Sequence, residues 1–310
     1  RIGAATRDRI LDYIEEHGFY PNAAAQSLAQ SKTNNIAIIL PEVNTLVDMP
    51  FFHTCMYGVE EVAQANDYDI IVVTTNGNDT KPLERLIQNR KVDGMILTRT
   101  YENDKYVKFL KQKQIPFVAV GKFPDDDVVQ VDHDNVGACK ELVTVLFAKG
   151  IQNIAYLGSN MDQMVNRCRY QGYEEAYRKG KRKLVASSGK LNQDLVYTDL
   201  SSKAMVEKAV EELKKSGVEC ILCQDDYICD EAVRKLSHMG VRIPDQMKVA
   251  SCHYSRILEN YPVTVTSLKF NITELGRRSC QVLLDMIHGK TVPDKTLLDY
   301  EIILKESTKG

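Results

Sequence analysis

The 310-residue sequence lacks an excess of either charge, since 40 lysines and arginines face 42 aspartates and glutamates. The formal net charge of -2 supplies neither a basic field that attracts nucleic acid nor an acidic excess that favours disorder. No apolar run approaches the roughly 20 residues of a membrane span, and residues 1–20 do not have the layout of a signal peptide. We therefore expect a cytoplasmic protein without a membrane partner.

The sequence also lacks the loops that hold phosphates in α/β enzymes. No strand pattern is followed by G-x-G-x-x-G, and no segment reads G-x-x-x-x-G-K-[ST]. Nor do the candidate cleft residues contain a nucleophile with a neighbouring base. We therefore expect no enzymatic activity, no catalytic residues and no cofactor.

The eight cysteines are not spaced as a disulfide framework, so free thiols are expected. Cys220, Cys223 and Cys229 are spaced closely enough to suggest zinc binding or a redox pair. However, "VECILC" has the pattern of a buried strand, in which residues three apart point to opposite faces. We interpret these cysteines as core residues and predict no metal site.

Short apolar segments alternate with helical patterns along most of the chain. The strands expected in the first half are 35–40, 68–73, 92–97, 115–120 and 127–132. Those expected in the second half are 154–159, 194–199, 218–223 and 247–252. The pattern predicts an α/β fold made of two doubly wound, parallel-sheet subdomains, in keeping with a length typical of about two domains.

The N-terminal 34 residues have a different pattern. Thr6 is a candidate N-cap for an amphipathic helix, and Gly18 and Pro21 are stop signals after it. The following "PNAAAQSLAQ" is too short to be a stable helix alone, because helix nucleation is costly. It is either a segment that folds only with a partner or a flexible linker.

Further motifs follow in a fixed order along the chain. They are "PFF" (50–52), "GVE" (58–60), "VDG" (92–94), "VDHDNVGA" (131–138), "RYQGYEEA" (169–176), "QDD" (224–226), "VRIPDQMKVAS" (241–251) and "TSLKFNITELG" (266–276). Together with residues 6–28, this series resembles the lactose repressor (LacI/GalR) family of bacterial transcription regulators. The first two helices of that family's helix-turn-helix headpiece are not in the sequence, so we expect a fragment.

The resemblance implies a periplasmic-binding-protein-like fold of type I, with two subdomains joined by three crossovers. We expect these crossovers near 150–152, 265–268 and 290–294. The expected domains are a headpiece remnant and hinge (1–34), an N-terminal subdomain (35–150 plus 266–292) and a C-terminal subdomain (151–265 plus 293–310).

The resemblance also implies partners. Family members act as homodimers that bind operator DNA and a small effector, often a carbohydrate, in the cleft between the subdomains. Paired hinge helices insert a leucine into the minor groove, and the matching residues here are Asn22, Ala25 and Leu28. Leu28 would be the inserted side chain, and Ala25 is small enough to allow close approach.

Two charged residues of the implied cleft match the family. Arg169 matches an arginine that reaches the ligand from the start of a helix, and its planar fork suits hydroxyl pairs or a carboxylate. The alternative is a surface charge, as we expect for the solvent-facing Arg167. Asp134 follows a strand and begins a helix, so it is either an N-cap or an effector contact.

The other candidate contacts bear on specificity, and three of them depart from the family pattern. Gln224 stands before Asp225 where asparagine is common, which predicts a shorter pocket. His253 replaces the usual aspartate, either as a hydrogen-bonding group or as an ordinary loop residue. Phe270 replaces a polar residue and, with Phe52, adds a stacking face unless both belong to the core.

These observations predict a ligand-responsive transcription regulator, a repressor, with a sugar or sugar derivative as its effector. The alternative is a solute-binding protein of a membrane transporter, which shares the fold and the cleft. Such a protein would be exported, and the residues at the N-terminus argue against export.

Overall fold

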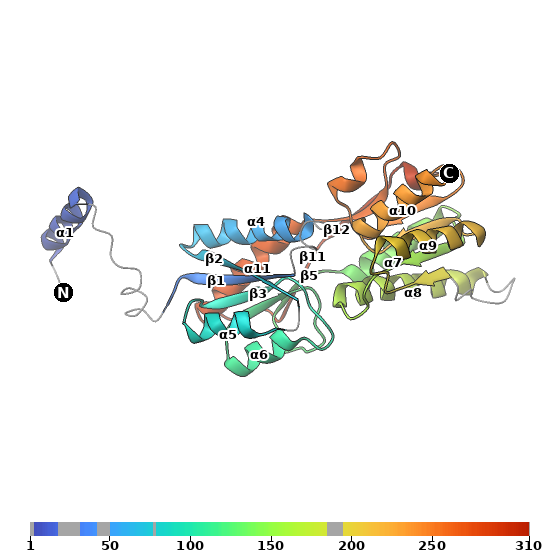
Figure 1. Cartoon of the computed structure of the whole chain (residues 1–310). Coiled ribbons are helices and arrows are strands. Elements are labelled where there is room, and N and C mark those ends of the chain that lie inside the picture. Colours follow the sequence, from blue (N-terminus) through green and yellow to red (C-terminus); the bar gives the residue numbers. More distant parts are fainter. Residues whose placement is uncertain (1–2, 18–31, 42–49, 77–78, 185–194, 310) are drawn as a thin grey trace.

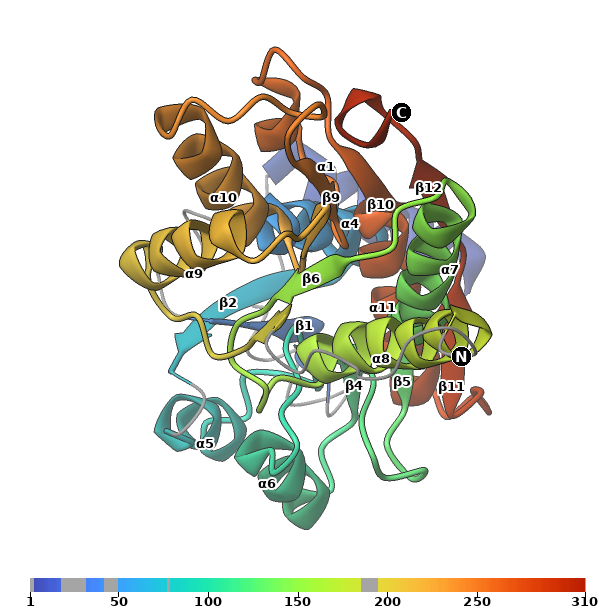
Figure 2. The ribbon, with the colours of Figure 1, turned by 90° about the vertical axis from the view of Figure 1, so that its right-hand side faces the viewer.

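A computed structural model describes residues 3–17, 32–41, 50–76, 79–184 and 195–309. Helix α1 (Ala4–His17) precedes a core in which the strands pair into two sheets of six strands each. Figure 1 shows the two sheets in two lobes that lie side by side, and Figure 2 shows the second lobe facing the viewer. Both the α/β class and the division into two parallel-dominated sheets were predicted from the sequence, and both are confirmed.

The first sheet, which defines the first lobe, has the order β11-β5-β4-β3-β1-β2 and is parallel throughout. Its strands are β1 (Asn35–Pro41), β2 (Asp69–Thr75), β3 (Gly94–Leu97), β4 (Phe117–Val120), β5 (Gln130–His133) and β11 (Lys295–Leu298). Helices α4 (Pro50–Ala65) and α11 (Ile272–Ile287) cover one face, and α5 (Lys81–Gln88) and α6 (Lys105–Lys113) cover the other. The central strands are β-branched and apolar because both of their faces are buried.

The second sheet, which defines the second lobe, has the order β12-β10-β9-β8-β6-β7, and only the β10–β12 pair is antiparallel. Its strands are β6 (Ile154–Leu157), β7 (Val196–Tyr197), β8 (Cys220–Cys223), β9 (Lys248–Ser251), β10 (Thr266–Phe270) and β12 (Tyr300–Ile303). Helices α7 (Asn135–Ala148) and α8 (Met164–Leu184) cover one face, and α9 (Lys203–Lys215) and α10 (Asp226–His238) cover the other.

The chain passes between the lobes three times. It leaves β5 for α7 at Asp134, β10 for α11 at Asn271, and β11 for β12 at Asp299. At the first two crossings the crossing residue caps the next helix: the Asp134 carboxylate accepts from the N–H of Gly137 (2.9 Å), and the Asn271 side chain accepts from that of Glu274 (3.0 Å).

The predicted crossings near 150–152, 265–268 and 290–294 were therefore wrong. The expected boundaries gave α7 and β11 to the wrong lobes, and β10 as well, because they assumed that a helix stays with the strand before it. Strand pairing puts β10 in the second sheet and β11 in the first. The apolar side of α7, including Leu142 and Leu146, is buried against the second sheet.

A glycine allows α7 to pack closely in the second lobe. A methyl group at Gly172 of α8 would lie 2.3 Å from the carbonyl oxygen of Val136 in α7, so glycine permits the two helices to cross closely. The first lobe uses the same device, since a methyl group at Gly276 of α11 would lie 2.1 Å from the carbonyl oxygen of Cys55 in α4. Within the residues that the structure describes, every helix is too short or too polar to traverse a bilayer.

Candidate functional site

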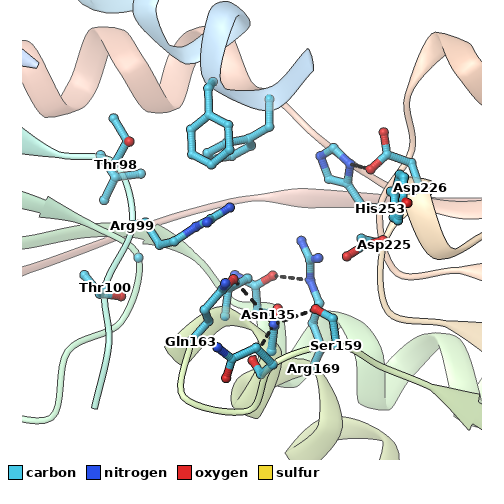
Figure 3. Close-up of a pocket in the computed structure, with 18 of the residues that line it drawn as sticks. Thr98, Arg99, Thr100, Asn135, Ser159, Gln163, Arg169, Asp225, Asp226 and His253 are labelled. Atoms are coloured by element: carbon cyan, nitrogen blue, oxygen red, sulfur yellow. Dashed lines mark hydrogen bonds and ion pairs between the residues drawn. The ribbon is translucent and has the colours of Figure 1, made fainter. Parts of the chain in front are cut away.

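A cavity of about 650 Å³ lies between the lobes at the carboxyl ends of the parallel strands. The first lobe contributes residues at the start of α4 and after β3, together with the end of β5. The second lobe contributes residues that follow β6, β7, β8 and β9. Figure 3 shows these side chains converging on a common space from both lobes.

Arg169 of α8 lies at the bottom of this space and is 8% exposed. Its Nε donates to Oδ1 of Asn135 (3.1 Å), and its Nη1 donates to the main-chain oxygen of Gln224 (3.0 Å). Among the described residues no carboxylate lies within 4.0 Å of its guanidinium, and no hydrogen bond reaches Nη2. The guanidinium is therefore oriented by neutral acceptors and retains donors for a ligand.

His253 and Asp226 form a buried pair on the second lobe. Nδ1 of His253 lies 3.2 Å from Oδ1 of Asp226. Burial alone would raise the pKa of the Asp226 carboxyl, but the hydrogen bond and charge of His253 lower it overall. Because an ionised carboxylate only accepts, Nδ1 of His253 donates to it. Nε2 of His253 is buried and has no partner among the described residues.

Two aromatic side chains contact His253, and a third ring packs against one of them. The Phe270 ring stacks with that of His253 at a centroid distance of 6.2 Å and an interplanar angle of 17°. His133 lies against another side of Phe270, at 4.8 Å. Phe51 contacts the His253 ring edge-on at 6.2 Å. The first-lobe and second-lobe walls of the cavity thus meet in one aromatic cluster.

Asp132 and His133, at the end of β5, have opposite pKa shifts. Burial raises the pKa of Asp132 to about 7, although the His133 N–H and the Arg169 charge oppose this. Burial lowers the pKa of His133 to about 4, and the nearby charges of His253 and Arg169 lower it further. At neutral pH His133 is therefore uncharged, while Asp132 is near its midpoint. Oδ1 of Asp132 accepts from the His133 N–H (2.8 Å) and from Asn135 Nδ2 (3.0 Å).

The structure brings five of the predicted effector contacts to the wall of the cavity. They are Phe52, Arg169, Asp225, His253 and Phe270. Asp225 also caps α10, because its Oδ1 accepts from the Ile228 N–H at 2.8 Å. Its pKa is raised by burial and by the charge of Asp226.

Two predicted contacts do not line the cavity. Asp134 is the N-cap of α7 and borders a separate pocket of about 170 Å³. Gln224 is fully buried behind the wall, where its Oε1 accepts from the Ser159 N–H (3.0 Å) and its main-chain oxygen orients Arg169. Its longer side chain turns into the lobe, which the sequence position alone did not reveal. The predicted hinge residues Asn22, Ala25 and Leu28 lie outside the described residues.

Sequence reasoning missed a group of amide and hydroxyl side chains on the second lobe. Asn166 Nδ2 donates to Ser159 Oγ (3.1 Å) and to the main-chain oxygen of Asn160 (2.7 Å), which fixes the loop after β6. Gln163 and Asp199 lie beside this loop and also line the cavity. No sequence signal marks them, because these residue types are common in any loop.

Contacts across the cleft join the loop after β3 to the start of α8. The Met164 N–H donates to the Thr100 oxygen, and the Glu102 N–H donates to the Asp162 oxygen, both at 3.1 Å. Arg167 Nη1 lies 2.6 Å from Oε1 of Glu102. Arg167 was expected to face solvent only; it is half-exposed but pairs across the cleft, because the first turn of α8 faces the other lobe.

Among the described residues no cluster of three or more histidine, cysteine or carboxylate side chains could hold a metal ion. All eight cysteines are buried and unbonded. Cys220 and Cys223 pack in the cores on opposite faces of the second sheet, which confirms that they are core residues.

Comparisons with known proteins agree with this geometry. Residues 33–306 match the family described as periplasmic binding proteins and the sugar binding domain of the LacI family. The chain is 26% identical to the transcriptional regulator CelR of Thermobifida fusca, over 99% of this chain and 91% of that protein. It is 27% identical to the regulator MalR of Streptococcus pneumoniae, over 98% and 92%.

Two solved structures show the same fold. A CelR–cellobiose complex superposes with a TM-score of 0.79 at 24% identity, over 99% of this chain and 92% of that one. A probable maltose operon repressor from Staphylococcus aureus superposes with a TM-score of 0.80 at 19% identity, over 90% and 99%. Each match spans both lobes, so the arrangement of sheets around the cavity is shared.

The raised pKa of Asp132 predicts a specific pH dependence of stability. The carboxyl has its ordinary pKa of 3.8 in the unfolded chain and a pKa of about 7 in the folded chain. Its stabilisation of the folded state is therefore fully present below pH 3.8 and is lost as the pH rises through 7. Asp132→Asn lacks this loss, so the difference between its free energy of unfolding and that of the wild type should shift in favour of the variant between about pH 4 and pH 7. Urea unfolding across this range measures the difference.

Asp162→Asn is the matched control, because Asp162 is exposed beside the cleft and its side chain lines no pocket. Its stability should follow that of the wild type at every pH. Parallel pH profiles for Asp132→Asn and the wild type would contradict the assigned shift.

Proposed function

Because this chain belongs to the LacI family of sugar-binding domains, we propose that it is a ligand-responsive transcription regulator, a repressor. The main support for this proposal is the cavity, which is lined by residues of both lobes and lies beside the three crossings. A ligand held there contacts both lobes and favours one relative placement of them. We propose that the protein binds its ligand without catalysing a reaction, in keeping with relatives that are named as regulators.

The proposed effector is a carbohydrate. Aromatic rings, amides and an oriented arginine suit a molecule with apolar ring faces and many hydroxyls. A cellobiose complex of a relative with this fold supports the same class of ligand. Of the sequence-predicted contacts, Phe52, Arg169, Asp225, His253 and Phe270 are retained in this proposal; Gln224 and Asp134 act as supports for Arg169 and α7.

The proposed partners are operator DNA, bound by the full-length protein in the cytoplasm, and a second copy of the chain. Effector and DNA would be coupled through the placement of the two lobes. A transporter-type solute-binding protein remains the second candidate, because the family description includes periplasmic binding proteins. The regulators CelR and MalR, which match nearly the whole chain, favour the first.

The regulatory function is tested by joining a relative's helix-turn-helix headpiece before residue 1 and measuring binding to that headpiece's operator. A sugar that binds the core should change operator affinity about 5- to 150-fold, the usual range of such coupling. The same fusion carrying Arg169→Ala should bind the operator normally but lose the response. Operator binding that is indifferent to every sugar bound by the core would refute the proposal.

Arg169 should contribute strongly to effector affinity. Once thermal-shift screening against sugars has found a ligand, Arg169→Ala should weaken its binding by about 2 to 4 kcal/mol, because charged hydrogen bonds are lost and ligand oxygens are left unpaired. Calorimetry measures the change. Arg178→Ala is the control, since Arg178 lies on the solvent side of the same helix and pairs with Glu174. Equal affinities for the two variants would remove Arg169 from the site.

The homodimer should form through α4, α5 and the edge strand β2. Tyr57 of α4 is 65% exposed and Val72 of β2 is 50% exposed, at the free edge of the first sheet. An obligate pair buries about 2,000 Å² or more of such surface. Sedimentation at micromolar concentration should show a dimer for the wild type and a monomer for Tyr57→Glu with Val72→Glu. Leu304→Glu, which changes an exposed apolar residue of the second lobe, should remain dimeric.

A further inference from the structure

The size of the cavity bears on which carbohydrate it accepts. At the roughly 30 Å³ that one water occupies in the liquid, 650 Å³ accommodates on the order of 20 non-hydrogen atoms. One hexose has about a dozen and would leave nearly half of the space to water, whereas two joined hexoses have about two dozen. The volume is therefore that of a two-ring ligand.

One side of the cavity is built to hold a sugar ring by apolar and hydroxyl contacts. The Phe270 ring stacks on His253 and also contacts His133, so the aromatic cluster as a whole, rather than a free Phe270 face, presents apolar surface to a sugar. Nε2 of each histidine is buried and lacks a partner among the described residues. Buried polar atoms are seldom left unpaired, so a ligand that brings hydroxyl groups to them satisfies both. We name this side, with Arg169, the inner zone.

The other side has a different chemistry. Ser159, Asn160, Gln163 and Asp199 come from the loops after β6 and β7, and they present amide, hydroxyl and carboxylate groups to the cavity. Figure 3 shows Gln163 and His253 on opposite sides of the space, with Arg169 between them. The side-chain oxygen of Gln163 is 3.5 Å from Asn166 Nδ2, a weak contact that leaves the Gln163 amide free to turn toward a ligand. We name this side the outer zone.

The charges of the lining select against an anionic sugar. Two arginines face four carboxylates, Asp132, Asp199, Asp225 and Asp226. Arg169 already donates to Asn135 and Gln224, so only part of its fork is left for a ligand. A phosphate or carboxylate on the ligand would lie close to carboxylates such as Asp226, whose pKa is lowered by His253, and the repulsion between like charges would weaken its binding.

We infer that the effector is a neutral disaccharide, with one ring in the inner zone between the aromatic cluster and Arg169 and the second ring in the outer zone at Gln163. This inference rests on the proposed function and narrows its ligand class. The inner ring is recognised by apolar contact with the aromatic cluster and by hydrogen bonds to the two imidazoles and Arg169. The outer ring is recognised by amide and carboxylate hydrogen bonds.

Calorimetry on the 310-residue chain tests the inference with named probes: glucose, galactose, fructose, glucose 6-phosphate, cellobiose, maltose, lactose and sucrose. At least one disaccharide should bind about 10-fold or more tightly than each of its component hexoses, because its second ring makes one or two further hydrogen bonds. Glucose 6-phosphate should bind more weakly than glucose. Gln163→Ala should weaken the disaccharide about 5-fold and change hexose binding less than about twofold.

Gln171→Ala is the matched control, because Gln171 is exposed on α8, which begins just after Gln163, and its side chain donates to Glu175. It should change neither affinity. A hexose or a phosphorylated hexose that binds as tightly as every disaccharide would overturn the inference, as would equal losses for both ligand sizes in Gln163→Ala, while leaving a sugar-responsive function intact. If none of the eight probes bound, the result would contradict the proposal of a carbohydrate effector and, with it, this inference.

Discussion

The three crossings of the chain are the constraint on which the site depends. Strand pairing sets His133 opposite Leu298 and Phe270 opposite Tyr300, and the His133 and Phe270 rings lie 4.8 Å apart. The crossings are therefore neighbours, and the residues just before two of them, His133 and Phe270, line the cavity. A ligand that contacts these residues acts directly beside the covalent links between the lobes in the described part of the core.

The ionisable side chains of the site are stabilised in different ways. Arg169 is oriented by an amide and a main-chain oxygen, whereas Asp226 is stabilised by His253. For Asp132 the hydrogen bond from the His133 N–H and the charge of Arg169 only partly offset burial, so its pKa is raised. A neutral acceptor fixes the direction of the Arg169 fork without neutralising its charge, so its attraction for ligand oxygens is preserved.

The cleft is held on its open side by contacts of modest strength. Two main-chain hydrogen bonds and the half-exposed pair between Arg167 and Glu102 join the loop after β3 to α8. Exposed ion pairs contribute on the order of 0 to 1 kcal/mol, so these contacts do not lock the lobes together. A ligand that adds contacts in the cavity can therefore shift the balance between closed and open arrangements by an appreciable factor.

The sequence by itself determined the α/β class and nine of the twelve strands in the described residues, because apolar runs such as "NIAIIL" and "CILC" fix a buried strand locally; β10, β11 and β12 were not expected. It also indicated Arg169, His253 and Phe270, through a position in an ordered set of motifs. It did not determine which lobe receives α7, since that depends on the packing of its apolar side against the second sheet and on its close approach to Gly172 of α8.

The tertiary structure alone decided which polar side chains face the cavity. Gln224 and Gln163 have the same side chain, yet the first is buried behind the wall and the second lines it. The difference arises because the Ser159 N–H lies next to Gln224 and captures its amide oxygen. Composition and periodicity specify which residues are buried, whereas the direction of a polar side chain depends on partners that only the folded chain brings within hydrogen-bonding distance.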